Sequence, residues 1–349
     1  MNLQEKFYIA TKNILLNNLK VNDNIFLNKD IIFVYDLDSK LSQELSKWYI
    51  KSLRELQNLN ISRNIEKIDF NKFDKEELKN KLLNLKENST VILVQSTNFM
   101  LDNFRIRLNL NNAWVWCLEH RHLAYIYDNQ IENYADSIEY KTPYYQDLWF
   151  KLKKISDVAN SMKFICNDWS ILNVDWWFED MKINDWNYDW KNRWGNFPIW
   201  ENFTEAKKFD NVNGELSIYA FPDEKLKVEF VKPFKIKIEK SKIMWDESIY
   251  PETFKNILNF IKESEDWEVM FRELGFWLNN WITKDKPLSD INSYERIAWF
   301  HISLWKKHQI YRRKLDKSIV QRYHIDIFPD IKEIYIDEKL VFKNGNYII

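Results

Sequence analysis

Potential metal ligands gather in the last third of the sequence. His324 and Asp326 form an H-x-D pair, and on an extended strand both side chains would face the same side. His301 and His308 lie upstream with a separation of seven residues, which is two turns of a helix and predicts a shared helix face. Together with Glu273, these imidazole and carboxylate groups are donors that first-row divalent metals accept. They predict a metal site, although an H-x-D pair also arises by chance and both upstream histidines fit an ordinary helix.

A second pair of histidines lies earlier in the chain. His120 and His122 stand in CLEHRHL, directly after a predicted strand, where an H-x-H pair would face one side. Glu119 is the one carboxylate at an obvious spacing from them. Because histidine is commonly exposed or partly buried, we interpret the pair as surface or domain-interface residues rather than as a chelating site.

The composition indicates a globular protein without a nucleic-acid partner. The 349 residues carry a formal net charge of -1, so the chain lacks the basic excess that is typical of nucleic-acid binding. Hydrophobic residues make up 45% of the chain, which is ordinary for a globular fold. The 17 tryptophans are unusual, and we interpret them as filling of cores and interfaces rather than as the lining of an aromatic pocket.

The cysteines and the start of the chain predict a cytoplasmic protein. Cys117 and Cys166 are far apart and have no metal-ligand spacing, so we expect reduced thiols. The first residues contain no apolar stretch of signal-peptide length. No segment approaches the roughly 20 apolar residues that span a bilayer, so no membrane partner is expected.

Two domains follow from the pattern of elements. Up to about residue 125, short apolar runs such as IIFVYD (31–36) and TVILVQS (90–96) alternate with helical patterns, which predicts an open, largely parallel α/β sheet in residues 1–125. No glycine-rich phosphate loop follows these strands, so a nucleotide site is not expected there. Residues 126–349 predict a larger mixed α/β domain, and the chain as a whole is α/β in fold class, or α+β overall.

Within the second domain, strands and helices are both expected. Residues 164–180 and 214–244 alternate in a β manner, and the C-terminal residues resemble a hairpin. Helical patterns cover residues 251–263 and 289–312. The longer of these helices would carry His301 and His308.

Four sequence blocks occur in the order and at the spacing of a known family. The blocks are GNFPIWENF (195–203), RELGFWLN (272–279), WFHIS (299–303) and RYHIDIF (322–328). Through them the chain resembles the aminopeptidase T and aminopeptidase S family of dinuclear metallopeptidases. The resemblance covers most of the chain and implies a metallopeptidase-like C-terminal domain and a homodimer.

The resemblance also implies a set of ligands and an activity. Carried over position by position, the metal ligands would be Glu201, Glu273, His301, His324 and Asp326. Such a set suits two ions of Zn, Co or Mn. Paired metals polarise a carbonyl group and activate a bound water, which would make the chain an aminopeptidase-like hydrolase of a peptide or peptide-like substrate.

The chain departs from the family at positions close to this implied site. Seven residues after the first histidine ligand the family has a catalytic tyrosine, whereas this chain has His308, with Tyr311 about one helical turn later. These two are the candidate catalytic residues. Trp200, Trp277 and Trp305 stand where the family has glycines, which would narrow or reshape the cleft.

Two further hypotheses stay open beside the hydrolase. With a single metal, His301, His324 and one carboxylate would form a facial triad for Fe(II), which predicts a tailoring oxygenase. A branch of the same superfamily is similar to ring-cleaving pyridine-diol dioxygenases of that kind. Alternatively, the chain is a non-catalytic, metal-free descendant that binds a partner or a peptide.

Overall fold

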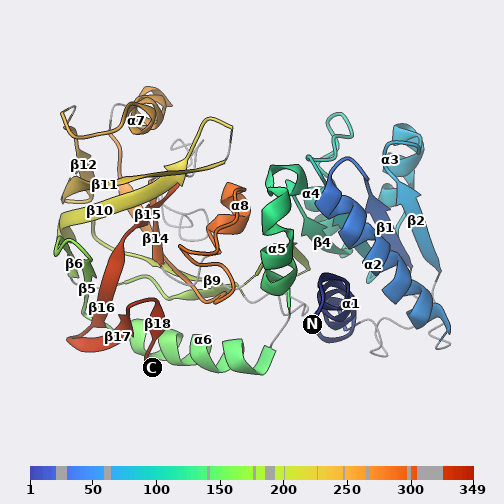
Figure 1. The fold of residues 1–349 in the computed structure, drawn as a ribbon, viewed down its shortest axis with the longest axis horizontal. Helices are drawn as coiled ribbons and strands as arrows, with labels where there is room; N and C mark the ends of the chain where they lie inside the picture. The colour runs from blue at the N-terminus through green and yellow to red at the C-terminus, as the bar shows by residue number, and fades with distance from the viewer. Residues whose placement is uncertain are drawn as a thin grey trace. The chain divides into compact units, whose positions relative to one another are not determined.

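The structure is a computed structural model, and its described residues form a mixed α/β fold, which confirms the predicted fold class (Figure 1). The described residues are 1–20, 30–58, 64–139, 142–175, 178–184, 193–199, 201–225, 227–246, 248–264, 268–296, 300–304 and 325–349.

The chain divides into two compact units, each assembled from segments far apart in the sequence. The first unit consists of residues 1–142, 185–199 and 284–293. The second consists of residues 143–184, 200–283 and 294–349. The domain boundary near residue 125 stays a prediction.

The first unit is built on a parallel sheet with the strand order β2-β1-β3-β4-β8. The strands are β1 (Ile31–Tyr35), β2 (Ile65–Asp69), β3 (Thr90–Val94), β4 (Trp116–His120) and β8 (Trp194–Phe197). The helices are α1 (Leu3–Asn13), continued by a π-helical segment (Ile14–Asn18), α2 (Lys40–Asn58), α3 (Lys75–Leu83), α4 (Ile106–Asn112) and α5 (Ile131–Ser137). Two short 3-10 segments, Leu123–Tyr125 and Asp128–Gln130, precede α5.

Helices cover both faces of this sheet. Alternate residues of each strand point to opposite faces, so each face presents side chains that a helix can bury. Ile32 and Val34 of β1 share a core with Leu78 and Leu82 of α3. On the other face, the ring of Phe33 lies 5.5 Å from that of Tyr49 on α2, measured between centroids. Strand β1 is therefore apolar on both sides, which explains why an uninterrupted apolar run marks it in the sequence.

The second unit is built on an antiparallel sheet whose described strands follow the order β18-β17-β16-β5-β6-β10-β15-β14-β13-β9-β7, with β11 and β12 paired beyond β10. The strands are β5 (Ser161–Cys166), β6 (Ile171–Asp175), β7 (Lys182–Asn184), β9 (Glu201–Glu205), β10 (Val212–Pro222), β11 (Val228–Glu239), β12 (Lys242–Met244), β13 (Phe271–Trp277), β14 (Phe300–Leu304), β15 (Ile325–Pro329), β16 (Ile331–Ile336), β17 (Lys339–Lys343) and β18 (Asn346–Tyr347).

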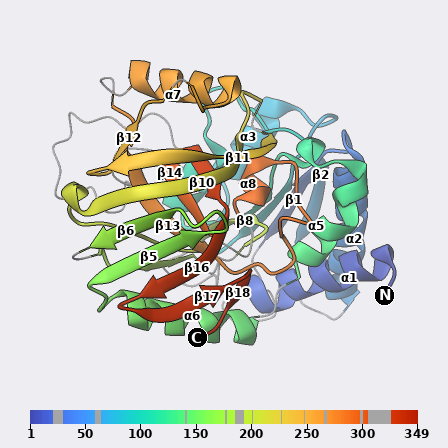
Figure 2. The same ribbon diagram turned by 60° about the vertical axis from the view of Figure 1, so that its left-hand side comes forward.

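Two helices pack at opposite ends of the second unit's sheet, and both views show them there (Figures 1 and 2). Helix α7 (Glu252–Ser264) lies along β11 and β12, and α6 (Thr142–Ser156) lies along β17 and β18. Phe254 and Leu258 of α7 and Leu152 of α6 belong to the same buried core as the strands. A short 3-10 segment (Phe209–Asn211) and the single-turn helix α8 (Ile291–Tyr294) complete the described elements.

The predicted helix over residues 289–312 is wrong. Only α8 is helical there among the described residues, and Phe300–Leu304 form strand β14. His301 therefore lies on a strand and not on the expected helix. His308, which was expected to share a helix face with it, lies outside the described residues. The structure also contains β2 and β8, for which the sequence pattern predicted no strand.

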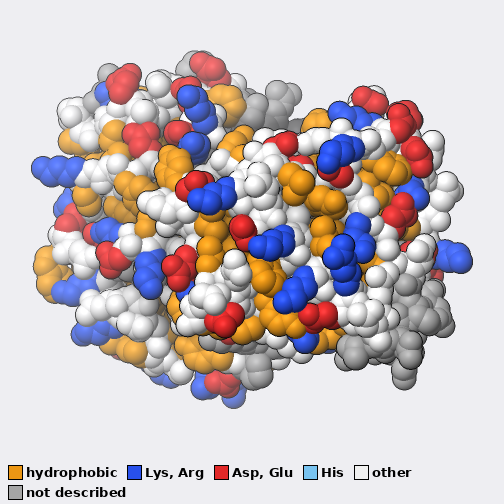
Figure 3. All heavy atoms as spheres, turned by 45° about the vertical axis from the view of Figure 1, so that its right-hand side comes forward, with side chains coloured by type: hydrophobic (Ala, Val, Ile, Leu, Met, Phe, Trp, Pro, Cys, Tyr) orange, Lys and Arg blue, Asp and Glu red, His pale blue; other side chains and the backbone are white. Residues whose placement is uncertain are grey.

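In the described part of the chain, no helix is long and apolar enough to cross a membrane. On the face drawn in Figure 3, the side chains of lysine and arginine are interspersed with those of aspartate and glutamate. This mixture agrees with the formal net charge of -1.

Candidate metal centre

Four neighbouring strands of the second unit, β9, β13, β14 and β15, carry polar side chains on one face. In their register, Trp277 pairs with Glu201, Gly275 with His301, and Ser303 with Asp326. Residues that lie directly opposite each other in a sheet share a face, as do residues two apart on one strand. Glu201, Glu273, His301 and Asp326 therefore project from the same side, and we call these four residues the carboxylate–imidazole cluster.

The opposite face of the same strands is apolar and lies in the core. Leu274 and Phe276 of β13, Ile302 of β14 and Ile327 of β15 are all buried there. Side chains of a strand alternate between its two faces. Because these apolar residues point into the core, the residues between them point to the cluster face. Core packing of the strands thus holds the candidate ligands in place.

A β-bulge at the start of β13 puts Glu273 on the cluster face. Phe271 pairs with Leu304 and Glu273 pairs with Ser303, with an irregularity of register between them. In a regular strand Phe271 and Glu273 would share a face. The extra residue, Arg272, shifts the phase, so that Phe271 lies in the core while Glu273 joins the cluster.

The cluster is compact and buried. Nε2 of His301 lies 3.7 Å from Oε1 of Glu273 and 3.7 Å from Oδ1 of Asp326. Ligand atoms of Glu201, Glu273 and His301 all lie within 4.8 Å of one another, which is the spacing of a group able to hold a metal ion. All four residues are buried.

Gly275 leaves the space that the imidazole of His301 occupies. A Cβ atom at this position would lie 1.9 Å from Cε1, 2.4 Å from Nε2 and 2.5 Å from Nδ1 of His301. Any larger residue at position 275 would therefore collide with the ring. The glycine is required by the close approach of the histidine and not by its backbone conformation.

The electrostatics of the cluster favour a cation. Burial, followed by the neighbouring carboxylate of Glu273, raises the pKa of Glu201 to about 7. Burial raises the pKa of Glu295 well above its ordinary value, and a hydrogen bond with Asp326 raises it further. Arg296, whose Nη1 lies 2.6 Å from Oε1 of Glu295, opposes both shifts. Among the described residues, the carboxyl groups of the cluster and of Glu295 outnumber the one cation beside them, Arg296, and a bound metal ion would balance part of this negative charge.

The structure thus brings together Glu201, Glu273, His301 and Asp326, whereas His308, Tyr311 and His324 lie outside the described residues. Metal binding by these residues stays a prediction. The structure shows only that three buried side chains are placed so that they could hold a metal ion. The identity of the metal and the expected pair of Zn, Co or Mn ions stay predictions.

Three neighbours of the cluster were missed by the sequence interpretation. Oγ of Ser303 donates a hydrogen bond to Oδ1 of Asp326 over 2.5 Å. Glu295 and Arg296 directly follow α8. Glu295 hydrogen-bonds with Asp326, and the positive charge of Arg296 lowers the pKa of Glu201. For Ser303 a local signal existed, because it lies two residues after His301 in an alternating apolar and polar run. For Glu295 and Arg296 the sequence offers no pattern that ties them to the cluster.

The second histidine pair is structural and lies within the first unit. His120 is fully buried, with Nε2 2.8 Å from the hydroxyl of Tyr49 and Nδ1 2.9 Å from the hydroxyl of Tyr134. His122 is also buried, and its Nδ1 lies 3.3 Å from Oδ1 of Asp290. Of the two expected positions, the surface is therefore wrong for both residues, and the domain interface stays a prediction.

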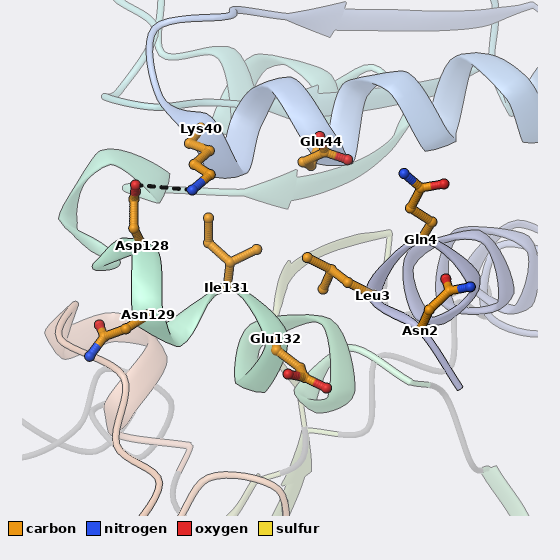
Figure 4. Close-up of a pocket in the computed structure, with 9 residues that line it drawn as sticks. All are labelled: Asn2, Leu3, Gln4, Lys40, Glu44, Asp128, Asn129, Ile131 and Glu132. Carbon is orange, nitrogen blue, oxygen red and sulfur yellow. Dashed lines mark hydrogen bonds and ion pairs between the residues drawn. The ribbon is translucent and has the colours of Figure 1, made fainter.

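A separate surface pocket of about 730 Å³ lies in the first unit (Figure 4). Lys40 and Asp128, which form an ion pair of 3.2 Å, are among the residues that line it. Its remaining lining consists of Asn2, Leu3, Gln4, Glu44, Asn129, Ile131 and Glu132. No residue of the carboxylate–imidazole cluster contributes to this pocket.

Fold and cluster together define a two-unit α/β protein with a buried group of metal-ligand type. No protein-family model matches the chain, and no curated protein matches it. The solved structure of 2,5-dihydroxypyridine dioxygenase from Pseudomonas putida KT2440 is similar to it, with a TM-score of 0.62 at 12% sequence identity. The similarity covers 99% of this chain and 97% of that one. At this level of identity the comparison establishes a shared fold.

The comparison corrects the interpretation that was drawn from the four sequence blocks. The resemblance to the aminopeptidase T and aminopeptidase S family is wrong as an assignment, because the similar structure is that of a dioxygenase and no family model matches. The predicted peptide hydrolase and the metallopeptidase-like character of the C-terminal domain are wrong with it. The expected homodimer was implied by that resemblance alone and stays a prediction.

Proposed function

We propose that the chain is a metal-dependent oxygenase that uses a single Fe(II) ion at the carboxylate–imidazole cluster. The observation that carries this proposal is the buried group of Glu201, Glu273 and His301. Support comes from the fold that the chain shares with 2,5-dihydroxypyridine dioxygenase over nearly its whole length. Fold likeness alone would not suffice, because one fold hosts many chemistries.

The residues fit an iron ion by their chemistry. Non-haem Fe(II) sites commonly combine two imidazoles and one carboxylate on one side of the metal and leave other positions open. The described cluster supplies one imidazole, and the predicted second one, His324, lies outside the described residues. Glu273 and Glu201 supply carboxylates and His301 supplies an imidazole; Asp326 lies within reach of His301 as a further donor. The excess of buried carboxyl groups would be neutralised by a dication.

Bound Fe(II) supplies the electron transfer to dioxygen that side chains cannot perform. The chain's own residues hold and orient the donors. Ser303 donates to Asp326, and Glu295, whose pKa burial raises well above its ordinary value, hydrogen-bonds the same carboxylate. These two contacts orient Asp326, as outer hydrogen bonds commonly do for metal ligands.

Buried aromatic side chains lie on the same face of the sheet as the cluster. Phe203 of β9 pairs with Gly275 and is buried on the cluster face. The ring of Phe328 lies 6.3 Å from that of His301, measured between centroids, and Trp277 is buried beside it. The substrate class that we propose is a planar ring with hydroxyl groups, which is the class of compound that the name of the similar dioxygenase states.

The test is iron loading followed by oxygen uptake. Metal-stripped protein is loaded with Fe(II) under anaerobic conditions, and bound iron is counted. Oxygen consumption is then measured with a panel of hydroxylated pyridines and benzene diols. We expect about one iron per chain and uptake with at least one compound.

Variants separate the cluster from the rest of the protein. Glu273→Gln and His301→Gln should lose most of the bound iron, because each removes a donor from the cluster. Glu119→Gln is the matched control, since Glu119 is a buried glutamate of the first unit. Iron bound without any oxygen uptake across the panel would reject the oxygenase. Absence of any metal binding would instead support a non-catalytic descendant of the fold.

A further inference from the structure

The indole of Trp277 is a direct neighbour of His301. Trp277 is 1% exposed, and its ring centroid lies 5.6 Å from that of His301. Its Nε1–H group donates a hydrogen bond to Nδ1 of His301. The guanidinium carbon of Arg296 lies 4.1 Å from the centroid of the indole. A guanidinium in this position over an aromatic face makes a cation–π contact with the indole.

This hydrogen bond fixes the tautomer of His301. The indole nitrogen only donates, so Nδ1 of His301 must be the acceptor, and a neutral imidazole then carries its proton on Nε2. Nε2 is the atom that faces the cluster, 3.7 Å from both Glu273 and Asp326. The imidazole therefore presents an N–H group, and not a lone pair, to the place where a metal would bind.

A metal ion needs the opposite tautomer. Coordination uses the lone pair of Nε2, so the proton of a neutral imidazole must be on Nδ1. In most metal sites that Nδ1–H donates to a carboxylate, a carbonyl or water. Here Nδ1 faces the indole N–H, and two donors pointed at each other repel.

We propose that Trp277 is a positioning residue that competes with metal binding at His301. On metal binding the indole–imidazole hydrogen bond breaks, the indole turns away from Nδ1, and the imidazole proton moves from Nε2 to Nδ1 by exchange with solvent. This inference deepens the proposed function and rests on its metal site.

Removal of the indole N–H should strengthen metal binding. Trp277→Phe keeps an aromatic ring beneath Arg296 but has no donor for Nδ1. Since a neutral hydrogen bond of this kind is worth a small net amount, we expect affinity for Zn²⁺ to rise about five- to tenfold. Trp245→Phe is the matched control, because Trp245 belongs to the same unit and packs on Lys262, away from the cluster residues.

Two magnetic-resonance measurements follow the bond itself, with Zn²⁺ as a diamagnetic probe. The indole N–H resonance of Trp277, assigned by its loss in Trp277→Phe, should move upfield when Zn²⁺ binds. With ¹⁵N-labelled histidine, only five residues contribute, and His301 is assigned by His301→Gln. Its signal should change from the Nε2–H tautomer in metal-stripped protein to the Nδ1–H tautomer with Zn²⁺. This second measurement uses the wild-type chain, so it decides the matter even if Trp277→Phe does not fold.

The outcomes separate this inference from the proposed function. If Zn²⁺ binds at the cluster but the tautomer of His301 and the indole resonance stay unchanged, the competition is refuted while the metal site stands. Equal or weaker Zn²⁺ affinity of Trp277→Phe would count against it in the same way. If neither Zn²⁺ nor Fe(II) binds to the wild-type chain or to Trp277→Phe, the metal site fails and the inference fails with it.

Discussion

Replacement of Gly275 by alanine tests the geometry of the cluster most directly. The new Cβ would lie 1.9 Å from Cε1 of His301, whereas carbon atoms in contact keep about 3.5 Å or more. The imidazole must therefore move by about 1.6 Å, because the opposing strand backbone is held by its ladder. Metal–ligand distances tolerate only about 0.2 Å, so His301 would cease to be a ligand.

Two magnitudes follow for Gly275→Ala. We expect Zn²⁺ affinity, measured by calorimetry, to fall by about 100-fold or more, since changes to outer contacts of metal ligands alone cost about 10- to 100-fold. Overpacking of a buried site should lower the free energy of unfolding by about 1–3 kcal/mol, measured in urea. Gly214→Ala is the control for stability: its Cβ would lie 2.1 Å from the backbone oxygen of Ile171, at φ +136°, and away from the cluster. It should destabilise the chain and leave the Zn²⁺ affinity of the folded protein intact.

A double-mutant cycle checks that the collision acts through His301. In His301→Ala the ring is gone, so addition of Gly275→Ala should cost little further stability and no further Zn²⁺ affinity. Additive losses in the double variant would show that Gly275 acts by another route. Zn²⁺ binding by Gly275→Ala at wild-type strength would refute the role of His301 as a ligand in this arrangement.

Three further predictions concern hydrogen bonds and protonation. Ser303→Ala removes the donor 2.5 Å from Asp326 and should weaken Zn²⁺ binding about tenfold in calorimetry, with Ser303→Thr close to wild type. Asp36→Ala removes the acceptor for the amide and the hydroxyl of Ser96, and should lower the free energy of unfolding by about 2–3 kcal/mol in urea. Asp38→Ala, at an exposed residue, is the control and should change the free energy of unfolding by no more than about 0.5 kcal/mol. Burial lowers the pKa of His120 to about 3, so the unfolded chain takes up a proton at a higher pH than the folded chain, and stability should fall as the pH decreases from about 6.5 towards 3, by up to about 1.4 kcal/mol per pH unit from this residue. His120→Gln should flatten that part of the pH profile; an unchanged slope would show that His120 is not the group responsible.

The parallel sheet of the first unit was predictable in part. IIFVYD and TVILVQS are apolar on both faces because helices cover both sides of the sheet, so local composition revealed β1 and β3. The edge strand β2 has the sequence IEKID, whose charged residues hide it from a hydrophobic pattern. Strand β8 pairs with β4 although the two are far apart in the sequence, and no local pattern reports such a partner.

The error at His301 has a physical origin. A spacing of seven residues matches two helical turns, but Phe300, Ile302 and Leu304 also alternate with His301 and Ser303, and the two patterns compete over this segment. That alternation has period two and is typical of a strand with one buried face. The core of the second unit needs those three apolar side chains, and their burial selects the strand.

The placement of Glu273 could not have been predicted from any periodicity. Phe271 and Glu273 are two residues apart, so a regular strand would send both side chains to one face. The structure sends them to opposite faces because a bulge at Arg272 adds a residue against β14. Such a bulge depends on the pairing partner and on the core that accepts Phe271, and neither is local in sequence.

The register of four strands, and not the strand order alone, brings the candidate metal ligands to one face of the sheet. A slip of one residue in β13 would turn Glu273 and Gly275 towards the core and bring Leu274 and Phe276 to the cluster face. The sheet would keep its strand order, yet one carboxylate and the space for His301 would be lost. The similarity to a dioxygenase concerns the fold, whereas the meeting of the buried carboxyl groups with His301 depends on the observed register of these strands.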